Sequence, residues 1–89
     1  MSLKSRFFKK PWQHANADKR LAAVSDEDDP ELISALPELV EHDPSAGVRL
    51  AALRRINTEP FWLDARLRES DPDIIEAADR FLLRAVVSE

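Results

Sequence analysis

Apolar residues recur along this chain of 89 residues with the spacing that places them on one side of a helix. Leu32, Leu36 and Val40 are separated by steps of four, and the glutamates of the same segment fall mainly on the other side. Val48 and Ala52 continue the pattern further along the chain. The pattern predicts helices over residues 17–25, 30–42, 45–57, 60–69 and 72–87.

Three Asp-Pro pairs mark where helices are expected to begin. An aspartate accepts hydrogen bonds from the free amides of a first helical turn, and a proline at the first helical position lacks only an N–H that has no partner there. The pairs are Asp29-Pro30, Asp43-Pro44 and Asp71-Pro72. A weaker start precedes Pro60, where any residue from Asn57 to Glu59 would serve as the cap.

Pro37 lies inside the second predicted helix. It removes one backbone hydrogen bond, so we expect a kink or a break into two short helices there. The connections between predicted helices are two to four residues long. Such short connections favour antiparallel neighbours and leave little room for loops with catalytic groups.

Three segments of the chain are variations on one pattern. The clearest copy contains Asp43, Pro44, Val48, Arg49, Ala51, Ala52 and Ile56. Taking Arg20, Arg49 and Glu76 as equivalent positions, the repeat steps are 29 and 27 residues, within the range of stacked helical repeats. The periodicity predicts an all-α fold, a short right-handed α-solenoid of two to three antiparallel helical hairpins.

The clearest copy resembles HEAT repeats, whose first helix commonly reads Asp-Pro, a spacer, Val-Arg, two alanines and a later leucine. The stretch from Phe7 to His14, with Asp18 after it, is similar to the start of large bacterial proteins that carry the domain of unknown function 349. The resemblance implies a bacterial protein of HEAT-like, armadillo-like repeats. Glu76 in place of the arginine and Asp79 in place of the second alanine argue against a regular ladder of charges between repeats.

Charge is distributed unevenly along the chain. Residues 1–20 contain six basic residues and one acidic residue, a net charge of +5, whereas the remainder contains seven basic and sixteen acidic residues, a net charge of −9. We therefore divide the chain into a basic and aromatic arm, residues 1–13, and a HEAT-like domain, residues 14–89. The acidic domain repels phosphate backbones over a Debye length of about 10 Å, which disfavours the wrapping of nucleic acid.

The arm interleaves cations with aromatic side chains, as segments that contact RNA or membrane surfaces do. The candidate residues for an anionic partner are Lys4, Arg6, Lys9, Lys10, Arg54 and Arg55. A structural role is the favoured alternative, in which Phe7, Phe8 and Trp12 cover the open apolar end of the first repeat. For Arg49 we likewise favour pairing with neighbouring carboxylates over contact with a partner.

The last predicted helix has a wider apolar arc than a terminal repeat needs. The candidate partner surface consists of Ile74, Ala78, Phe81, Leu82, Ala85 and Val86. A protein partner, the remainder of a longer parent chain, or a second copy in a homodimer would cover it. The alternative is that this helix is enclosed by its neighbours in the same chain.

Acidic residues and histidines give weak signals for chemistry. The run from Asp26 to Asp29 lacks the ligand spacing and glycine of a calcium-binding loop, so helix capping explains it better. His14 and His42 are 28 residues apart, which fits equivalent repeat positions or coincidence better than metal ligation. We expect no metal site.

Catalytic patterns are also weak. Glu59, Asp64 and Glu69 are five residues apart and do not share one helical face, which disfavours a paired-carboxylate active site. The chain has no cysteine, and no apolar run approaches the roughly 18 residues of a membrane span. We expect a cytoplasmic, non-enzymatic protein without a cofactor, acting as a protein-interaction or scaffold module. The alternative function is a nucleic-acid or ribosome-associated repeat protein that uses the basic arm.

Overall fold

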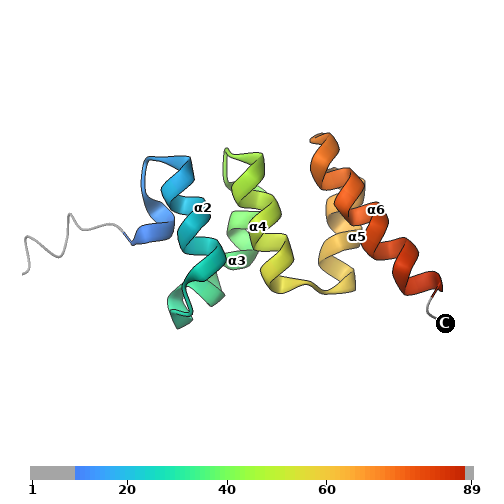
Figure 1. The fold of residues 1–89 in the computed structure, drawn as a ribbon, viewed down its shortest axis with the longest axis horizontal. Coiled ribbons are helices and arrows are strands. Elements are labelled where there is room, and N and C mark those ends of the chain that lie inside the picture. The colour runs from blue at the N-terminus through green and yellow to red at the C-terminus, as the bar shows by residue number, and fades with distance from the viewer. Residues whose placement is uncertain (1–9, 88–89) are drawn as a thin grey trace, which may run out of the picture.

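The computed structural model describes the backbone of residues 10–87 and the side chains of residues 10–84. All regular structure in this range is helical (Figure 1). The elements are the 3₁₀ turn η1 (Pro11–Gln13) and the α-helices α2 (Ala17–Asp26), α3 (Pro30–His42), α4 (Ala46–Ile56), α5 (Glu59–Arg68) and α6 (Pro72–Val87). The all-α prediction is confirmed, and the predicted helix limits differ from the observed ones by at most one residue.

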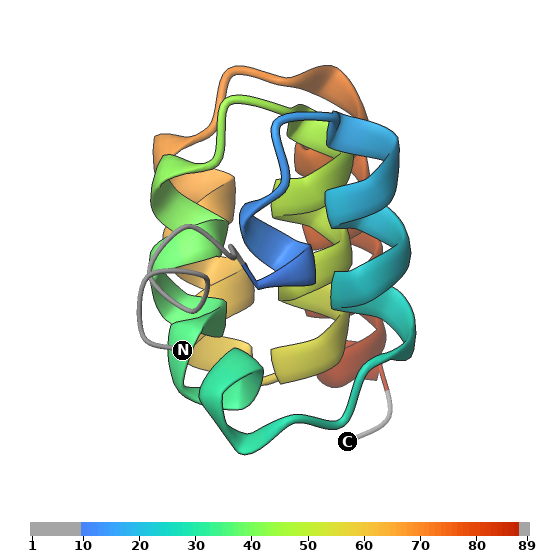
Figure 2. The ribbon, with the colours of Figure 1, turned by 90° about the vertical axis from the view of Figure 1, so that its left-hand side faces the viewer.

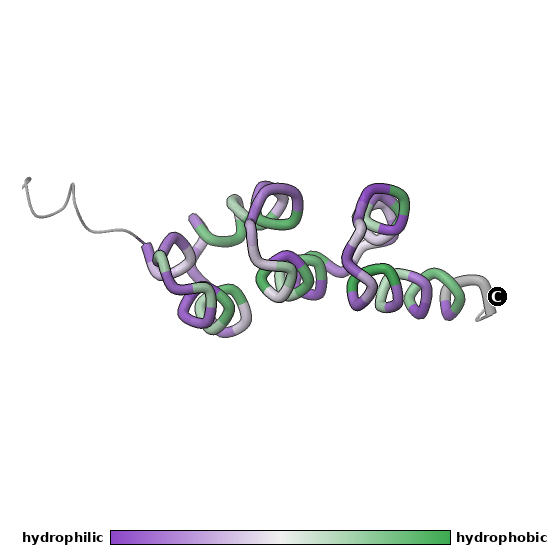
Figure 3. The backbone as a smooth tube through the Cα atoms, turned by 90° about the horizontal axis from the view of Figure 1, so that it is seen from above, coloured by the Kyte–Doolittle hydropathy of each residue, from purple (hydrophilic) through white to green (hydrophobic). Residues whose placement is uncertain are grey.

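The helices follow one another in a row with two layers (Figure 3). One layer contains α2, α4 and α6, and the other contains α3 and α5. α3 packs against α4, α5 packs against α6, and α2 contacts both η1 and α4. Seen from the N-terminal end, the chain passes clockwise from α2 through α3 to α4 as it recedes, so its path is right-handed (Figure 2). We call η1–α2, α3–α4 and α5–α6 the first, second and third helical units.

One apolar core extends through the row and receives residues from every element. Its buried members are Trp12, Ala23, Val24, Leu32, Leu36, Val40, Val48, Ala52, Leu53, Trp62, Ala65, Ile74 and Ala78. The predicted stripe of Leu32, Leu36 and Val40 is therefore the inner side of α3. Trp12 packs into this core, in agreement with a structural role, whereas Phe7 and Phe8 lie outside the described residues.

Capping hydrogen bonds define equivalent positions in α2, α4 and α6. The side chains of Asn16, Ser45 and Asp71 each accept hydrogen bonds from first-turn amides, as N-cap residues do. An alanine with at most 5% of its surface exposed follows each cap by seven positions, namely Ala23, Ala52 and Ala78. These small side chains allow neighbouring helices to approach closely.

The predicted alignment of the third repeat copy is wrong by one position. Arg20 and Arg49 both stand four positions after their N-caps, and in α6 that position is Ile75, not Glu76. The reason is that the aspartate of the Asp-Pro pair caps α6 directly, whereas α4 is capped by a serine two residues after the aspartate. The same shift places an alanine where the alignment had put Asp79.

One further expectation about helix ends is wrong, and the break that was one of the two outcomes expected at Pro37 does not occur. Asp43 does not cap α4 but is the C-terminal cap of α3, and its carboxylate accepts the amide of Ser45 at 2.9 Å. Pro37 does not divide α3, which runs unbroken through it. Both Pro37 and Ile33, whose carbonyl loses its helical partner, are exposed, so water can take the place of the missing N–H.

Candidate interaction face

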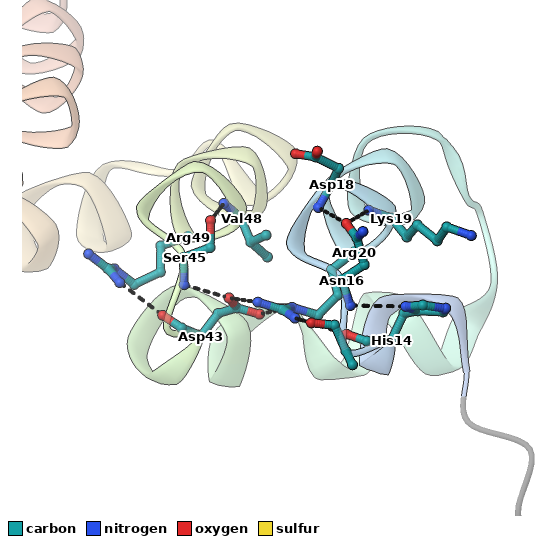
Figure 4. A network of polar contacts seen from close by, with 10 residues as sticks. His14, Asn16, Asp18, Lys19, Arg20, Asp43, Ser45, Val48 and Arg49 are labelled. Atoms are coloured by element: carbon teal, nitrogen blue, oxygen red, sulfur yellow. Dashed lines mark hydrogen bonds and ion pairs between the residues drawn. The ribbon is translucent and has the colours of Figure 1, made fainter.

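Two arginines in the same repeat position join consecutive helical units. Figure 4 shows Arg20 at the carboxylate of Asp43 and Arg49 at the carbonyl of Asp43. Arg20 donates Nε and Nη2 to the two carboxylate oxygens of Asp43, at 2.9 and 3.0 Å, and Nη1 to the carbonyl of His14 at 2.8 Å. Arg49 donates Nε and Nη2 to the carboxylate of Glu69, at 2.8 and 3.2 Å, and Nη1 to the carbonyl of Asp43 at 2.8 Å. Each guanidinium thus connects two successive helix ends.

The acceptors of this ladder are equivalent residues as well. His14, Asp43 and Glu69 each stand two positions before an N-cap. The equivalent of His14 is therefore Asp43 rather than His42, so of the two interpretations of the histidine spacing, equivalence and coincidence, coincidence holds. The pairing of Arg49 with a neighbouring carboxylate follows the structural expectation, and the two pairs form a ladder of two steps that does not continue into the third copy.

The ladder ends at α6. Its next arginine position is occupied by the half-buried Ile75, which has no charge to offer to a carboxylate. Glu76, the residue first aligned with the arginines, instead pairs with Arg80 one turn further along the same helix, at 3.0 Å. Within the third unit, α6 is held on α5 by apolar packing and by the ion pair of Arg66 with Asp79, not by a further arginine of the ladder.

The layer of α2, α4 and α6 is hollowed on both sides of α4. The larger hollow, of about 480 Å³, lies between α4 and α6, and the smaller one, of about 390 Å³, lies between α2 and α4. Leu50 and Arg54 line both hollows. We call the combined surface of the two hollows, centred on Leu50 and Arg54, the interaction face.

An aromatic pair forms the floor of the larger hollow. Trp62 of α5 and Phe81 of α6 stack with ring centroids 5.5 Å apart and planes 22° from parallel. The Trp62 indole donates to the side-chain oxygen of Asn57 at 3.0 Å. Asn57 ends α4 in the left-handed conformation, with φ of 50° and ψ of 49°. The loop after α4 therefore fixes the orientation of the indole ring, and with it the shape of the floor.

Arginines form the rim of the face. The two hollows together are lined by four arginines, Arg54, Arg55, Arg80 and Arg84, and by two carboxylates, those of Asp73 and Glu76. Arg54 and Arg80 both stand nine positions after their N-caps, where α2 has Ser25. The equivalence of Arg54 and Arg80 could be recognised in the sequence only once the N-caps of α4 and α6 were known.

The structure places the described members of the candidate anionic site in different roles. Lys10 pairs with Glu31 at 2.7 Å, and this hydrogen bond raises the pKa of the Lys10 ammonium above its ordinary value. Arg55 donates to the carbonyls of Val24 and Glu27 at the end of α2. Lys4, Arg6 and Lys9 lie outside the described residues. Arg54 alone among the described members is exposed on the interaction face without a partner in the described part of the chain.

The candidate partner surface on α6 is not a single exposed patch over the side chains that the structure describes. Ile74 and Ala78 are 0% exposed and belong to the core, because α5 covers that side of α6. Phe81 and Leu82 are half-buried against the core, and the side chains of Ala85 and Val86 lie outside the described range. Leu83, at 63% exposed, was not among the candidates.

The acidic residues singled out in the sequence mostly take part in helix ends and ion pairs. Asp29 caps α3 by accepting the amide of Glu31, and Asp28 pairs with Arg55 at 3.3 Å. Asp64 pairs with Arg68 one turn along α5. Over residues 10–84, no three acidic, histidine or cysteine side chains gather closely enough to hold a metal ion.

Comparisons with known proteins give no indication of function, so the function is inferred from the geometry described above. No protein-family model matches the chain, and no match was found among the curated proteins or the solved structures. None of the helices in residues 10–87 has the length and apolar character needed to cross a bilayer.

Proposed function

We propose that this chain is a non-enzymatic protein-interaction module, built as a short α-solenoid of HEAT-like helical hairpins, and that its partner docks on the interaction face. The observation that supports the proposal most is the pair of adjoining hollows on one side of the helix row, which share Leu50 and Arg54. A ligand that occupies both hollows at once contacts all three helices of the layer.

The composition of the face agrees with this role. Arginine and aromatic residues are enriched at the centres of protein interfaces, whereas lysine and glutamate are depleted there. Here the stacked rings of Trp62 and Phe81 lie beneath the larger hollow, with arginines around it. Both hollows have volumes in the range of 300 to 1,000 Å³ that is typical of ligand sites.

The helices beneath the face are connected by ion pairs and hydrogen bonds, and such pre-organisation lowers the entropic cost of binding. The two ladder arginines join the units at one end of the helices. Arg55 joins α4 to the end of α2 through two carbonyls, at 2.9 and 2.7 Å. The smaller hollow therefore lies between two helices that Arg55 holds together, and the larger hollow lies where Arg49 joins the second unit to the third.

A matched pair of substitutions tests the proposal. Leu50→Glu places a charge where the two hollows meet, and Leu67→Glu makes the same change on α5, where Leu67 is 78% exposed and lines neither hollow. The immobilised proteins are used to capture partners from a lysate of the source organism, with and without nuclease and with stepwise salt elution. Circular dichroism confirms that each variant is folded.

The proposal predicts one discrete protein that stays bound to the wild type and to Leu67→Glu through nuclease and high salt, and that is lost from Leu50→Glu. Two results contradict it. One is capture that Leu50→Glu leaves unchanged. The other is recovery of ribosomal or nucleic-acid material that leaves below about 0.3 M salt, as a few phosphate contacts predict. That second result would favour the basic arm as the site.

A further inference from the structure

Arg54 is the cation of the interaction face that is most available to a ligand. Its side chain is exposed, lines both hollows, and forms no hydrogen bond or ion pair within the part of the chain that the structure describes. Its neighbour Arg55 is already bound to carbonyls of the first unit. A guanidinium offers five N–H donors in a planar fork that matches the two oxygens of a carboxylate. Arg54 therefore has its donors free for an incoming acid.

The charge of the face differs in sign from that of the chain. Four arginines and two carboxylates line the hollows, a net charge of +2, whereas the chain as a whole has a net charge of −4. An acidic ligand is thus attracted to this face and repelled by the remainder of the surface. A polyanion with a charge on every residue places many charges against the acidic remainder of the surface, whereas a short segment with one or two carboxylates places its charge at the face.

The spacing of the hollows limits the shape of the ligand. They lie on either side of α4, whose diameter with side chains is about 10 Å, so their centres are separated by on the order of 10 Å. A polyproline II segment rises about 3.1 Å per residue and completes a turn every three residues. Its side chains i and i+3 therefore point to the same side at about 9 Å. Two apolar side chains with this spacing reach the two hollows, and the residues between them pass over Arg54.

We propose that the interaction face binds an extended peptide segment in which two apolar side chains, three positions apart, flank an acidic residue that pairs with Arg54. This inference rests on the proposed function and specifies its ligand. The apolar side chains occupy the hollow over Trp62 and the hollow beside α2. The carboxylate accepts from the guanidinium at the point that the two hollows share.

The test uses the full chain and a synthetic probe, acetyl-Ser-Val-Pro-Glu-Leu-Ser-amide, at low salt. Its proline favours the extended conformation. Proton–nitrogen NMR spectra report binding through the indole N–H of Trp62, which lies in the larger hollow, while the indole of Trp12 in the first unit serves as an internal control. We expect the Trp62 indole and the amides around Leu50 to shift on titration, and the Trp12 indole to stay in place.

Matched changes in the probe and in the protein isolate the ion pair. Replacing the glutamate of the probe by glutamine is expected to weaken binding three- to fivefold, the range of a partly exposed charge pair. Arg54→Gln should weaken binding of the glutamate probe by the same factor and leave the two probes indistinguishable. Arg68→Gln removes an equal charge from α5, outside both hollows, and should change neither affinity.

Three results overturn the inference. The first is equal affinity of the wild type for the glutamate and glutamine probes. The second is absence of binding by the glutamate probe at millimolar concentration. The third is a larger shift of the Trp62 indole by a ten-nucleotide oligouridylate than by the glutamate probe. If any of these occurs while Leu50→Glu still abolishes capture of a discrete protein, the acidic ligand is wrong and the protein-interaction function stands.

Discussion

Arg20 and Asp43 are 23 residues apart in the chain, yet the guanidinium of Arg20 donates two hydrogen bonds, of 2.9 and 3.0 Å, to the two carboxylate oxygens of Asp43. The side chains are only 12% and 3% exposed. Asp43 also accepts the amide of Ser45, and its carbonyl receives Arg49. One residue at the end of α3 therefore joins the first unit to the second and receives the arginine that reaches the third, so its loss should weaken the connection between units.

We expect Asp43→Ala to lower the free energy of unfolding by about 3 to 5 kcal/mol, because it leaves the guanidinium of Arg20 without its carboxylate in a mostly buried site. Urea denaturation monitored by circular dichroism measures the change. Asp64→Ala removes a carboxylate from an exposed pair with Arg68 and should cost less than about 1 kcal/mol.

A chain of 89 residues has a total stability of only about 4 to 13 kcal/mol, so Asp43→Ala risks unfolding outright. Asp43→Asn keeps the shape and one acceptor oxygen, and should show a smaller loss in the same direction. Equal losses for Asp43→Asn and Asp64→Ala would mean that the ladder is no more stabilising than a surface ion pair.

The loop after α4 offers a separate test at Asn57. Asn57→Ala forces an alanine into the left-handed conformation, at a cost of about 1 to 2 kcal/mol, and also removes the acceptor of the buried Trp62 indole, at about 1 kcal/mol more. Asn57→Gly also removes the acceptor, but glycine adopts the left-handed conformation without steric cost. Denaturation should therefore rank the glycine variant as the more stable of the two.

Hydrogen exchange at the Trp62 indole provides the second readout for this loop. Both variants should exchange this proton faster than the wild type, since both lose the side-chain oxygen of Asn57. An alanine variant as stable as the glycine variant would show that the left-handed conformation at residue 57 imposes no strain.

Helix limits could be predicted closely because their signals are local. The Asp-Pro pair at residues 29 and 30 places the cap and the first helical residue as expected, and the stripe of Leu32, Leu36 and Val40 lies in the core. The repeat alignment failed because the same pair stands in two different relations to the cap, at α4 and at α6. Sequence spacing alone does not separate these cases.

The candidate sites were less predictable, because they depend on contacts between distant segments. Glu69 gave no local sign that it would receive Arg49, 20 residues earlier. The sequence places Ile74 and Ala78 on a wide apolar arc of α6, but it does not show that α5 covers them. The two hollows exist only where α2, α4 and α6 lie side by side, so the joint role of Leu50 and Arg54 is a property of the assembled layer.

The ion pair between Lys10 and Glu31 makes a prediction about pH. The carboxylate of Glu31, 2.7 Å from the ammonium, raises the pKa of Lys10 above the ordinary value of 10.5 in the folded protein. The stabilising contribution of this pair is therefore fully present below pH 10.5 and disappears as the pH rises through the higher folded value. An NMR titration of the lysine side chain measures the difference.

Glu31→Gln is the control for this titration, and it should return the pKa of Lys10 toward its ordinary value. If the two proteins titrate alike, the ion pair does not persist in solution. Lys10 would then be free to contact an anionic partner instead of pairing with Glu31 of α3. That result would favour the alternative function, nucleic-acid binding by the basic arm.

Gly47 gives the last prediction, because it stands in the first turn of α4 without a structural need for glycine. Its conformation is not left-handed, and a Cβ built on it meets only the Ser45 hydroxyl, at an ordinary contact distance of 3.6 Å. Gly47→Ala should therefore stabilise the chain by about 0.5 to 1 kcal/mol through the lower flexibility of the unfolded state. Urea denaturation measures the gain.

The same position tests how much of the smaller hollow a ligand uses. Gly47 lines that hollow, and a methyl group there narrows it only slightly, whereas Gly47→Leu fills part of its volume. Gly47→Ala should keep the affinity for the peptide probe, and Gly47→Leu should lose it while remaining as stable as the wild type. A leucine variant that binds as well as the alanine variant would restrict the ligand to the larger hollow between α4 and α6. It would thereby rule out a segment that places apolar side chains on both sides of Arg54.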